Sequence, residues 1–178
     1  MNPIKILALK NFPFVEPDDD LASIIDKSIS LNNIKIDDSD VFIVAQKIIS
    51  KSENRYVDLD TIEVSEEAES LALKLNKNKG LVQAIINESK KIISTEKNIL
   101  IVEHKLGFIN INAGIDQSNI SQHKNTALLL PENPTKSAID LYQKLSSRLN
   151  KDISIIISDS MTRPFRSGIT NFALASHN

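Results

Sequence analysis

A hydrophobic run near the end of the chain leads directly into side chains that can hold cations and anions. Ile153–Ile157 is rich in isoleucine, a β-branched residue typical of buried strands. Asp159 and Ser160 follow it with the oxygen ligands that Mg²⁺ and Mn²⁺ prefer. Arg163 and Arg166 add two forked donors suited to phosphate or carboxylate. The stretch predicts either a cation and anion site at a strand end or a surface loop with a structural salt bridge.

A second candidate lies in the segment NAGIDQSN. Gly114 favours a tight turn, because glycine adopts backbone conformations that other residues avoid. Just beyond it, Asp116 can hold a hard cation, and Asn119 can donate to a phosphate or a base. The same residue types fit an Asx-turn, in which the aspartate caps its own backbone. The residues alone leave both interpretations open.

A pair of lysines is a candidate for binding phosphates. Lys47 and Lys51 lie four residues apart after an apolar run, so a helix would place them on one face. They would clamp phosphates there, or extend into solvent as most lysines do. A Walker loop is absent, so any nucleotide must be held in another way. A phosphatase with the pattern DxDxT is disfavoured, because Met161 stands where that pattern has its second aspartate.

The histidines and an acidic triplet have simpler explanations than metal binding. His104, His123 and His177 lack metal-type spacing, and we expect the last two at the surface. His104 follows Glu103 at a predicted strand end, where a hydrogen-bonded structural role is expected. The run Asp18–Asp20 suits a helix N-terminus, because acidic side chains there complement the helix dipole.

Composition narrows the class of protein. The chain has 178 residues, 41% hydrophobic and 25% charged, as is ordinary for a globular protein. A net charge of −2 argues against nucleic acid as the main partner, since its binders carry a basic excess. The absence of Cys excludes disulfides and thiolate metal sites. With no secretory signal and no apolar run near the ~18 residues that span a bilayer, we expect a cytoplasmic protein.

The hydrophobic pattern predicts mixed helices and strands. Strands are expected at Ile4–Leu9, Val41–Gln46, Asn98–His104 and Ile153–Ile157, with an alternating stretch after Phe108. Helices are expected at Asp19–Leu31 behind Asp18, from Ser65 to Leu75, from Leu81 to Ile93, and after Pro134. We find no repeat or linker. The pattern indicates an α+β fold in a single domain, 1–178.

Several segments, in the same order along nearly the whole chain, resemble one family. They are NFPFVEPDDDLASII, VFIVAQKIISKSENR, GFININAGIDQSN, LLLPENPTKSA and ISDSMTRPFRSGITN. Each is similar to a segment of the coenzyme F-420:L-glutamate ligase (F-420-0:gamma-glutamyl ligase) family. The resemblance implies that family's α+β fold, a mixed sheet with flanking helices, and an intertwined homodimer. It also implies GTP-dependent amide formation between L-glutamate and a deazaflavin phospholactate precursor.

The resemblance assigns residues to a ligase site. Asp116 and Asp159 match divalent-metal ligands, and Ser160 matches a second-metal position, for Mg²⁺ or Mn²⁺, with K⁺ as a further cation. The positions that match GTP contacts are Phe12, Pro13, Phe14, Val15, Gln46, Lys47, Lys51 and Asn119. Amide formation needs an activated carboxylate, expected here as an acyl phosphate. Arg163 and Arg166 would hold the acceptor's anionic groups or the transferring phosphoryl, and no covalent protein nucleophile is expected.

The chain also departs from the family pattern. Thr162 stands where the family usually has Gly, Phe165 where it has Trp, and Phe12 where Leu is common. The chain ends earlier than the family pattern, so we expect a C-terminally truncated member. Two alternatives stay open: a related amide ligase with another acceptor, and a catalytically inactive protein that binds nucleotide or metal.

Overall fold

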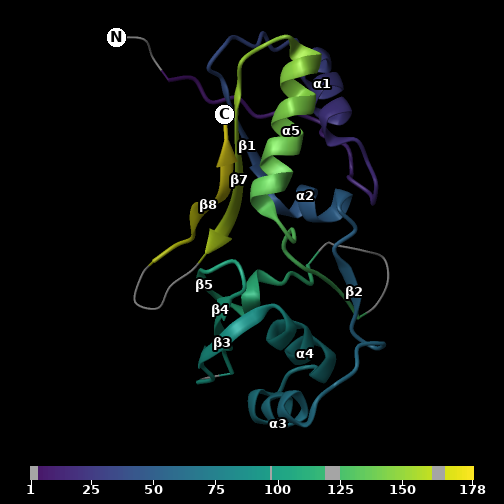
Figure 1. Ribbon diagram of the computed structural model, residues 1–178, viewed down its shortest axis with the longest axis vertical. Helices are drawn as coiled ribbons and strands as arrows, with labels where there is room; N and C mark the ends of the chain where they lie inside the picture. Colours follow the sequence, from purple (N-terminus) through teal and green to yellow (C-terminus); the bar gives the residue numbers. More distant parts are fainter. Residues whose placement is uncertain (1–3, 97, 119–124, 162–166) are drawn as a thin grey trace. The chain divides into compact units, whose positions relative to one another are not determined.

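The computed structural model describes residues 4–96, 98–118, 125–161 and 167–178 and has an α+β fold (Figure 1). The chain divides into two compact units. Unit 1 comprises Met1–Asn54, Asn133–Ser158 and Ala173–Asn178, and unit 2 comprises Arg55–Glu132 and Asp159–Phe172. The prediction of an α+β fold is confirmed, whereas the single ligase-like domain stays a prediction.

Unit 1 is built on a mixed three-stranded sheet with the order β1-β7-β8. Its strands are β1 (Val41–Ala45), β7 (Ser154–Met161) and β8 (Thr170–His177), of which β7 and β8 continue into unit 2. β1 runs parallel to β7, and the arrows of β7 and β8 point in opposite directions (Figure 1). The helices are α1 (Leu21–Leu31), α2 (Gln46–Ser52) and α5 (Pro134–Leu149). Inward residues of the sheet, such as Ile155 and Ile157, form one core with apolar faces of these helices.

Unit 2 combines two antiparallel sheets with two helices. A ribbon pairs β2 (Tyr56–Asp58) with β6 (Thr126–Leu128), and a sheet joins β3 (Ser89–Ser94), β4 (Ile101–His104) and β5 (Ile109–Ile111). The helices are α3 (Glu66–Leu75) and α4 (Lys79–Asn87), and a short 3₁₀ turn, Asn112–Gly114, follows β5. The core of this unit includes Val82, Ile85 and Leu100.

Local sequence signals explain where the helices begin. Asp20, not Asp18, caps α1 by accepting from the Ser23 N–H. Ser65 caps α3, and Pro134 lies in the first turn of α5, both as predicted. Gly80 lies inside α4, where an added Cβ would approach the Leu59 carbonyl oxygen to 2.0 Å.

Two predicted elements are wrong. The helix expected through Ile93 ends at Asn87, because Ser89–Ser94 pairs with β4 and this pairing overrides the local helical pattern. The strand expected at Ile4–Leu9 is absent: the segment joins no sheet of the described chain, and Ile4 is 93% exposed. The short strands β2 and β6 were not predicted. None of the helices described has the length and apolar character that a membrane span requires.

Candidate functional site

Asp116 follows a strained turn. Three consecutive residues, Asn112, Ala113 and Gly114, have positive φ angles of 50°, 54° and 69°. Ala113 is fully buried, and a Cβ on Gly114 would come within 3.1 Å of Leu130. Left-handed non-glycine residues are costly and persist only where their surroundings enforce them. The tight turn predicted at Gly114 is therefore confirmed, and it begins two residues earlier.

The Asp116 carboxylate is oriented by its own chain. Its Oδ1 accepts from the backbone N–H and the hydroxyl of Ser118, both at 2.7 Å. Its backbone exchanges two hydrogen bonds with Leu128, of 3.0 and 2.8 Å. These hydrogen bonds form the Asx-turn that the sequence allowed. Because a carboxylate held in this way can also be a metal ligand, metal binding by Asp116 stays a prediction.

Asp159 and Ser160 lie within β7, which extends past the predicted end at Ile157 to Met161. Asp159 is half-buried, and its Oδ1 accepts from the Ser160 N–H at 2.8 Å, while Ser160 is exposed. Successive side chains of a strand point to opposite faces. The side chains of Asp159 and Ser160 are therefore expected on opposite faces of β7, and their roles as ligands of two different cations stay predictions.

The donor set suits a hard divalent cation. Asp116, Asp159 and Ser160 offer carboxylate and hydroxyl oxygens, which Mg²⁺ and Mn²⁺ prefer. Both aspartates belong to unit 2. In the part of the chain that the structure describes, no three or more His, Asp or Glu side chains gather as a metal site. A cation here would rest on few protein ligands, as is common when phosphates supply the others.

The described residues that are expected to contact GTP belong to unit 1. Gln46, Lys47 and Lys51 share α2, so the predicted common face of the lysines is confirmed, and both are half-buried. Gln46 is buried and accepts from the Ser50 hydroxyl at 2.9 Å, so its side chain is rigidly placed.

The loop from Phe12 to Val15 is divided between core and surface. Val15 is buried in the core of unit 1, and Phe12 packs against that core. Pro13 is exposed, and Phe14 is 92% exposed, which makes Phe14 the aromatic ring of this loop available to a ligand. The predicted positions Asn119, Arg163 and Arg166 lie outside the described residues, as do His123, Thr162 and Phe165.

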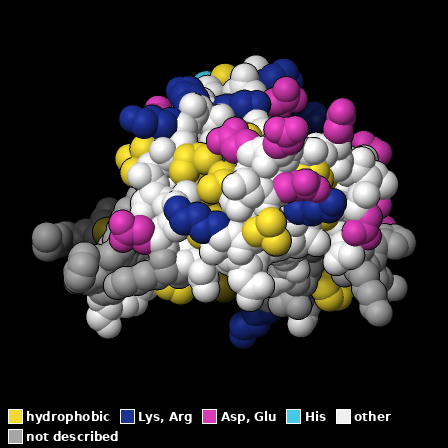
Figure 2. Space-filling model, turned by 90° about the horizontal axis from the view of Figure 1, so that it is seen from below, with side chains coloured by type: hydrophobic (Ala, Val, Ile, Leu, Met, Phe, Trp, Pro, Cys, Tyr) yellow, Lys and Arg dark blue, Asp and Glu magenta, His cyan; other side chains and the backbone are white. Residues whose placement is uncertain are grey.

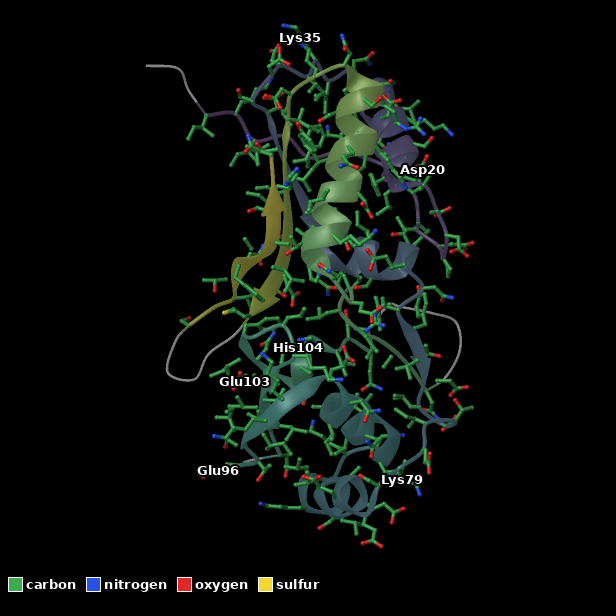
Figure 3. All side chains as sticks on the ribbon, viewed as in Figure 1. Asp20, Lys35, Lys79, Glu96, Glu103 and His104 are labelled. Atoms are coloured by element: carbon green, nitrogen blue, oxygen red, sulfur yellow. The ribbon has the colours of Figure 1, made fainter. Side chains whose placement is uncertain are left out.

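His104 is the structural histidine that was predicted. It is 2% exposed and is the last residue of β4, directly after Glu103 (Figure 3). Its Nδ1 accepts from the Leu106 N–H at 2.9 Å, and its ring stacks on Phe108. Burial, assisted by the charges of Lys105, Arg55 and Lys90, lowers its pKa from 6.5 to about 4. The ring is therefore neutral at pH 7, with its proton on Nε2.

Sequence reasoning missed a polar cluster around this histidine. Arg55 donates to the Glu88 carboxylate at 3.4 Å, and His104 Nε2 lies 3.8 Å from the same oxygen. No local sequence signal indicated this cluster, because Arg55 and Glu88 are 33 residues apart and Glu88 fell inside a predicted helix.

On the face of the molecule shown in Figure 2, positively and negatively charged side chains are interspersed rather than gathered by sign.

Comparison with known proteins finds relatives of one description. The family model described as F420-0:Gamma-glutamyl ligase matches residues 10–178. A "Coenzyme F420:L-glutamate ligase" of Methanocaldococcus jannaschii is 40% identical over 78% of this chain and 55% of the relative. Proteins of the same description from Methanothermobacter thermautotrophicus and Methanopyrus kandleri are 33% and 34% identical, over 96% and 91% of this chain. These two matches span 67% and 62% of the relatives' lengths.

Proposed function

Because the chain belongs to the F420-0:gamma-glutamyl ligase family, we propose that it forms an amide bond between L-glutamate and a deazaflavin phospholactate precursor. The energy would come from GTP, through an acyl phosphate on the acceptor carboxylate. The chain spans 55 to 67% of the length of the three curated relatives described above, so its activity, substrates and partners are proposals. The observation that carries the proposal is the family match together with the anchored Asp116 in the matching motif.

The described residues fit this chemistry. Transfer of a phosphoryl group needs its negative charge stabilised and its donor held in place. Asp116 and Asp159 would hold Mg²⁺ or Mn²⁺, which neutralises phosphate charge when bound. Lys47 and Lys51 present two ammonium groups from one helical face for the phosphates. Gln46, fixed by Ser50, and the exposed ring of Phe14 would contact the rest of the nucleotide.

Further assignments complete the proposal. Arg163 and Arg166 would hold the acceptor's anionic groups or the transferring phosphoryl, with Asn119 on the nucleotide and Ser160 on a second cation. A homodimer, K⁺ as a further cation and a cytoplasmic location stay predictions. In the test below, GDP release without product would favour a related acceptor, and the absence of both from folded protein would favour binding without turnover.

The test is ligation by the 178-residue chain itself. The protein is incubated with GTP, Mn²⁺, L-glutamate and the deazaflavin precursor, and glutamylated product is sought by mass spectrometry with GDP followed in parallel. Product from the wild type, and about 10²-fold less or none from Asp116→Asn, is expected, since a lost electrostatic contact to the reacting groups costs that much. GDP without product would indicate another acceptor, and neither from folded protein would contradict the ligase.

A matched control separates site chemistry from turn structure. Asp58 is an exposed aspartate of unit 2 whose Oδ1 also accepts from the N–H two residues on, at 2.9 Å. Asp58→Asn therefore makes the same chemical change in the same kind of turn. It should retain wild-type product formation. Equal losses in Asp58→Asn and Asp116→Asn would mean that only turn structure was tested and would remove the support for Asp116 as a ligand.

A further inference from the structure

Arg55, Glu88 and His104, here called the Arg55 cluster, form a polar group inside unit 2. Arg55 is 23% exposed, Glu88 17% and His104 3%. Arg55 directly precedes β2, Glu88 is the C-terminal cap of α4, and His104 is the last residue of β4. Since the ring of His104 is neutral, its contact with Glu88 is not a salt bridge at pH 7. The single full ion pair of the cluster is Arg55 with Glu88.

The position of Glu88 is unfavourable for a negative charge, and Arg55 offsets this. A carboxylate at a helix C-terminus faces the negative end of the helix dipole. Its backbone is fixed as well, because its carbonyl accepts from the Lys105 N–H at 2.9 Å. Arg55 supplies the compensating charge through Nη2, 3.4 Å away. Among the described residues, His104 Nε2 has no hydrogen-bond partner and directs its proton towards the same region.

Arg55 also makes hydrogen bonds to the backbone segment that pairs with Asp116. Its Nε donates to the Leu130 carbonyl at 2.9 Å, and its own carbonyl accepts from the Leu129 N–H at 3.0 Å. Tyr56, which follows Arg55, pairs with Leu128, which precedes Leu129, in the antiparallel ribbon of β2 and β6. Leu128 then exchanges two hydrogen bonds with Asp116. The Leu128–Leu130 segment is thus hydrogen-bonded to Arg55 through Leu129 and Leu130, and to Asp116 through Leu128.

We propose that Arg55 is a positioning residue for Asp116: its guanidinium, locked by Glu88, fixes the Leu128–Leu130 segment and hence the carboxylate. The proposal rests on the proposed function, in which Asp116 is a cation ligand. A half-buried ion pair by itself adds little net stability, because desolvation offsets much of the attraction. Its consequence is geometric, since the fork of Arg55 joins a carbonyl and a carboxylate in one rigid plane.

The experiment measures Mn²⁺ binding, which needs no turnover. The 178-residue chain is titrated with Mn²⁺, and the free ion is followed by its EPR signal, well below the unfolding temperature. Arg55→Gln should bind Mn²⁺ about tenfold more weakly, the lower end of the effect of residues that orient metal ligands. Arg55→Lys should recover part of the loss, because one ammonium keeps the charge but not the fork.

Controls distinguish positioning from general structure. Lys79 forms an exposed ion pair with Glu69 in the same unit, with side chains 63% and 54% exposed. Lys79→Gln should leave the Mn²⁺ dissociation constant unchanged. If Arg55→Gln does not fold, Glu88→Gln and Arg55→Lys carry the test, each with an expected weakening of several-fold.

The outcomes separate the two proposals. Wild-type Mn²⁺ affinity in folded Arg55 and Glu88 variants, with binding lost in Asp116→Asn, would overturn the positioning role and leave the cation site standing. Wild-type affinity in Asp116→Asn, or no binding by the wild type, would overturn the cation site and the positioning role with it. Both proposals would be supported if Mn²⁺ binding were weaker in Arg55→Gln than in Arg55→Lys, and weaker in both than in the wild type. Lys79→Gln would then bind Mn²⁺ as the wild type does.

Discussion

The two units place their polar groups differently. In unit 1 the pair Arg148 and Asp20 lies at the surface, with side chains 41% and 45% exposed. In unit 2 the pair Arg55 and Glu88 is mostly buried, next to a buried histidine. Unit 2 also contains Ala113, which among the described residues is the one with positive φ that is neither Gly, Asn, Asp nor Ser. Both units have an apolar core, and unit 2 adds to it a mostly buried ion pair and a left-handed alanine directly before Gly114.

The apolar packing of unit 1 should give the largest effect. Leu145 on α5 is fully buried in its core, so Leu145→Ala removes methyl groups and leaves a cavity. We expect a loss of about 2–5 kcal/mol in the free energy of unfolding. Tyr142 in α5 reports on this unit once Tyr56 is replaced by Phe, because the chain has two tyrosines and no tryptophan.

The control for this prediction is another leucine of unit 1. Leu31 is 81% exposed at the end of α1, and Leu31→Ala should change stability by no more than about 0.5 kcal/mol. Urea unfolding followed by tyrosine fluorescence measures both variants. Equal losses at Leu145 and Leu31 would contradict the view that packing in the interior of unit 1 dominates its stability.

Gly114 tests the strained turn of unit 2. Gly114→Ala places a side chain at φ +69° and 3.1 Å from Leu130, so strain and crowding add. We expect a loss of about 2 kcal/mol, within the range for such backbone and overpacking effects. Tyr56 in β2 reports on this unit in a Tyr142→Phe background. Gly107 is the control: its φ is +91° but nothing lies within 4 Å of an added Cβ.

The two glycines together separate strain from crowding. Gly107→Ala should cost about 1 kcal/mol, since only the backbone conformation is unfavourable there. A loss at Gly114 no larger than that at Gly107 would show that Leu130 yields to the added methyl group. The turn would then be strained but not tightly enclosed, and the contrast with unit 1 would weaken.

His104 predicts a pH dependence specific to unit 2. Its pKa is about 4 in the folded chain and 6.5 when exposed, so the unfolded state binds the extra proton between these values. The stabilisation is present above pH 6.5 and is lost as the pH falls towards 4, with a slope of up to about 1.4 kcal/mol per pH unit. Urea unfolding from pH 7 to 4 should show this slope for the wild type and not for His104→Gln.

His177 provides the comparison for this measurement. It lies half-buried against Tyr142 in unit 1, with ring centroids 4.8 Å apart. His177→Gln should retain the slope of the wild type, because His104 remains buried and the charges of Lys105, Arg55 and Lys90 remain near it. If His177→Gln removed the slope instead, the buried titrating group would have been assigned to the wrong unit.

Predictions from sequence succeeded where the cause is local. Ser65, Pro134 and the turn at Gly114 carry their signal within a few residues, as a cap or a backbone preference. They failed where pairing decides: Ser89–Ser94 reads as helix until β4 supplies its hydrogen bonds, and Ile4–Leu9 reads as a strand although it joins no sheet of the described chain. The Asp116 turn was foreseen, but the Arg55 cluster requires residues brought together by the fold.

The smallest effect separates a helix cap from an ion pair in unit 1. Asp20 caps α1 through the Ser23 N–H and also accepts from Arg148 at 2.7 Å. Asp20→Asn keeps a capping oxygen but removes the charge, so it should cost about 0.5 kcal/mol or less, as for exposed ion pairs. Asp20→Ala removes both and should cost about 1 kcal/mol.

The comparison of these two variants, by urea unfolding at low and at 0.5 M salt, decides which interaction matters. A small loss in Asp20→Asn that disappears with salt is expected, because exposed charges are screened. The loss in Asp20→Ala should largely persist, since a hydrogen bond to a backbone N–H does not depend on distant charge. Equal losses would mean that the charge of Asp20, rather than its cap, holds α1 to α5. The exposed ion pair of unit 1 would then contribute more to stability than the mostly buried pair of Arg55 and Glu88 is expected to.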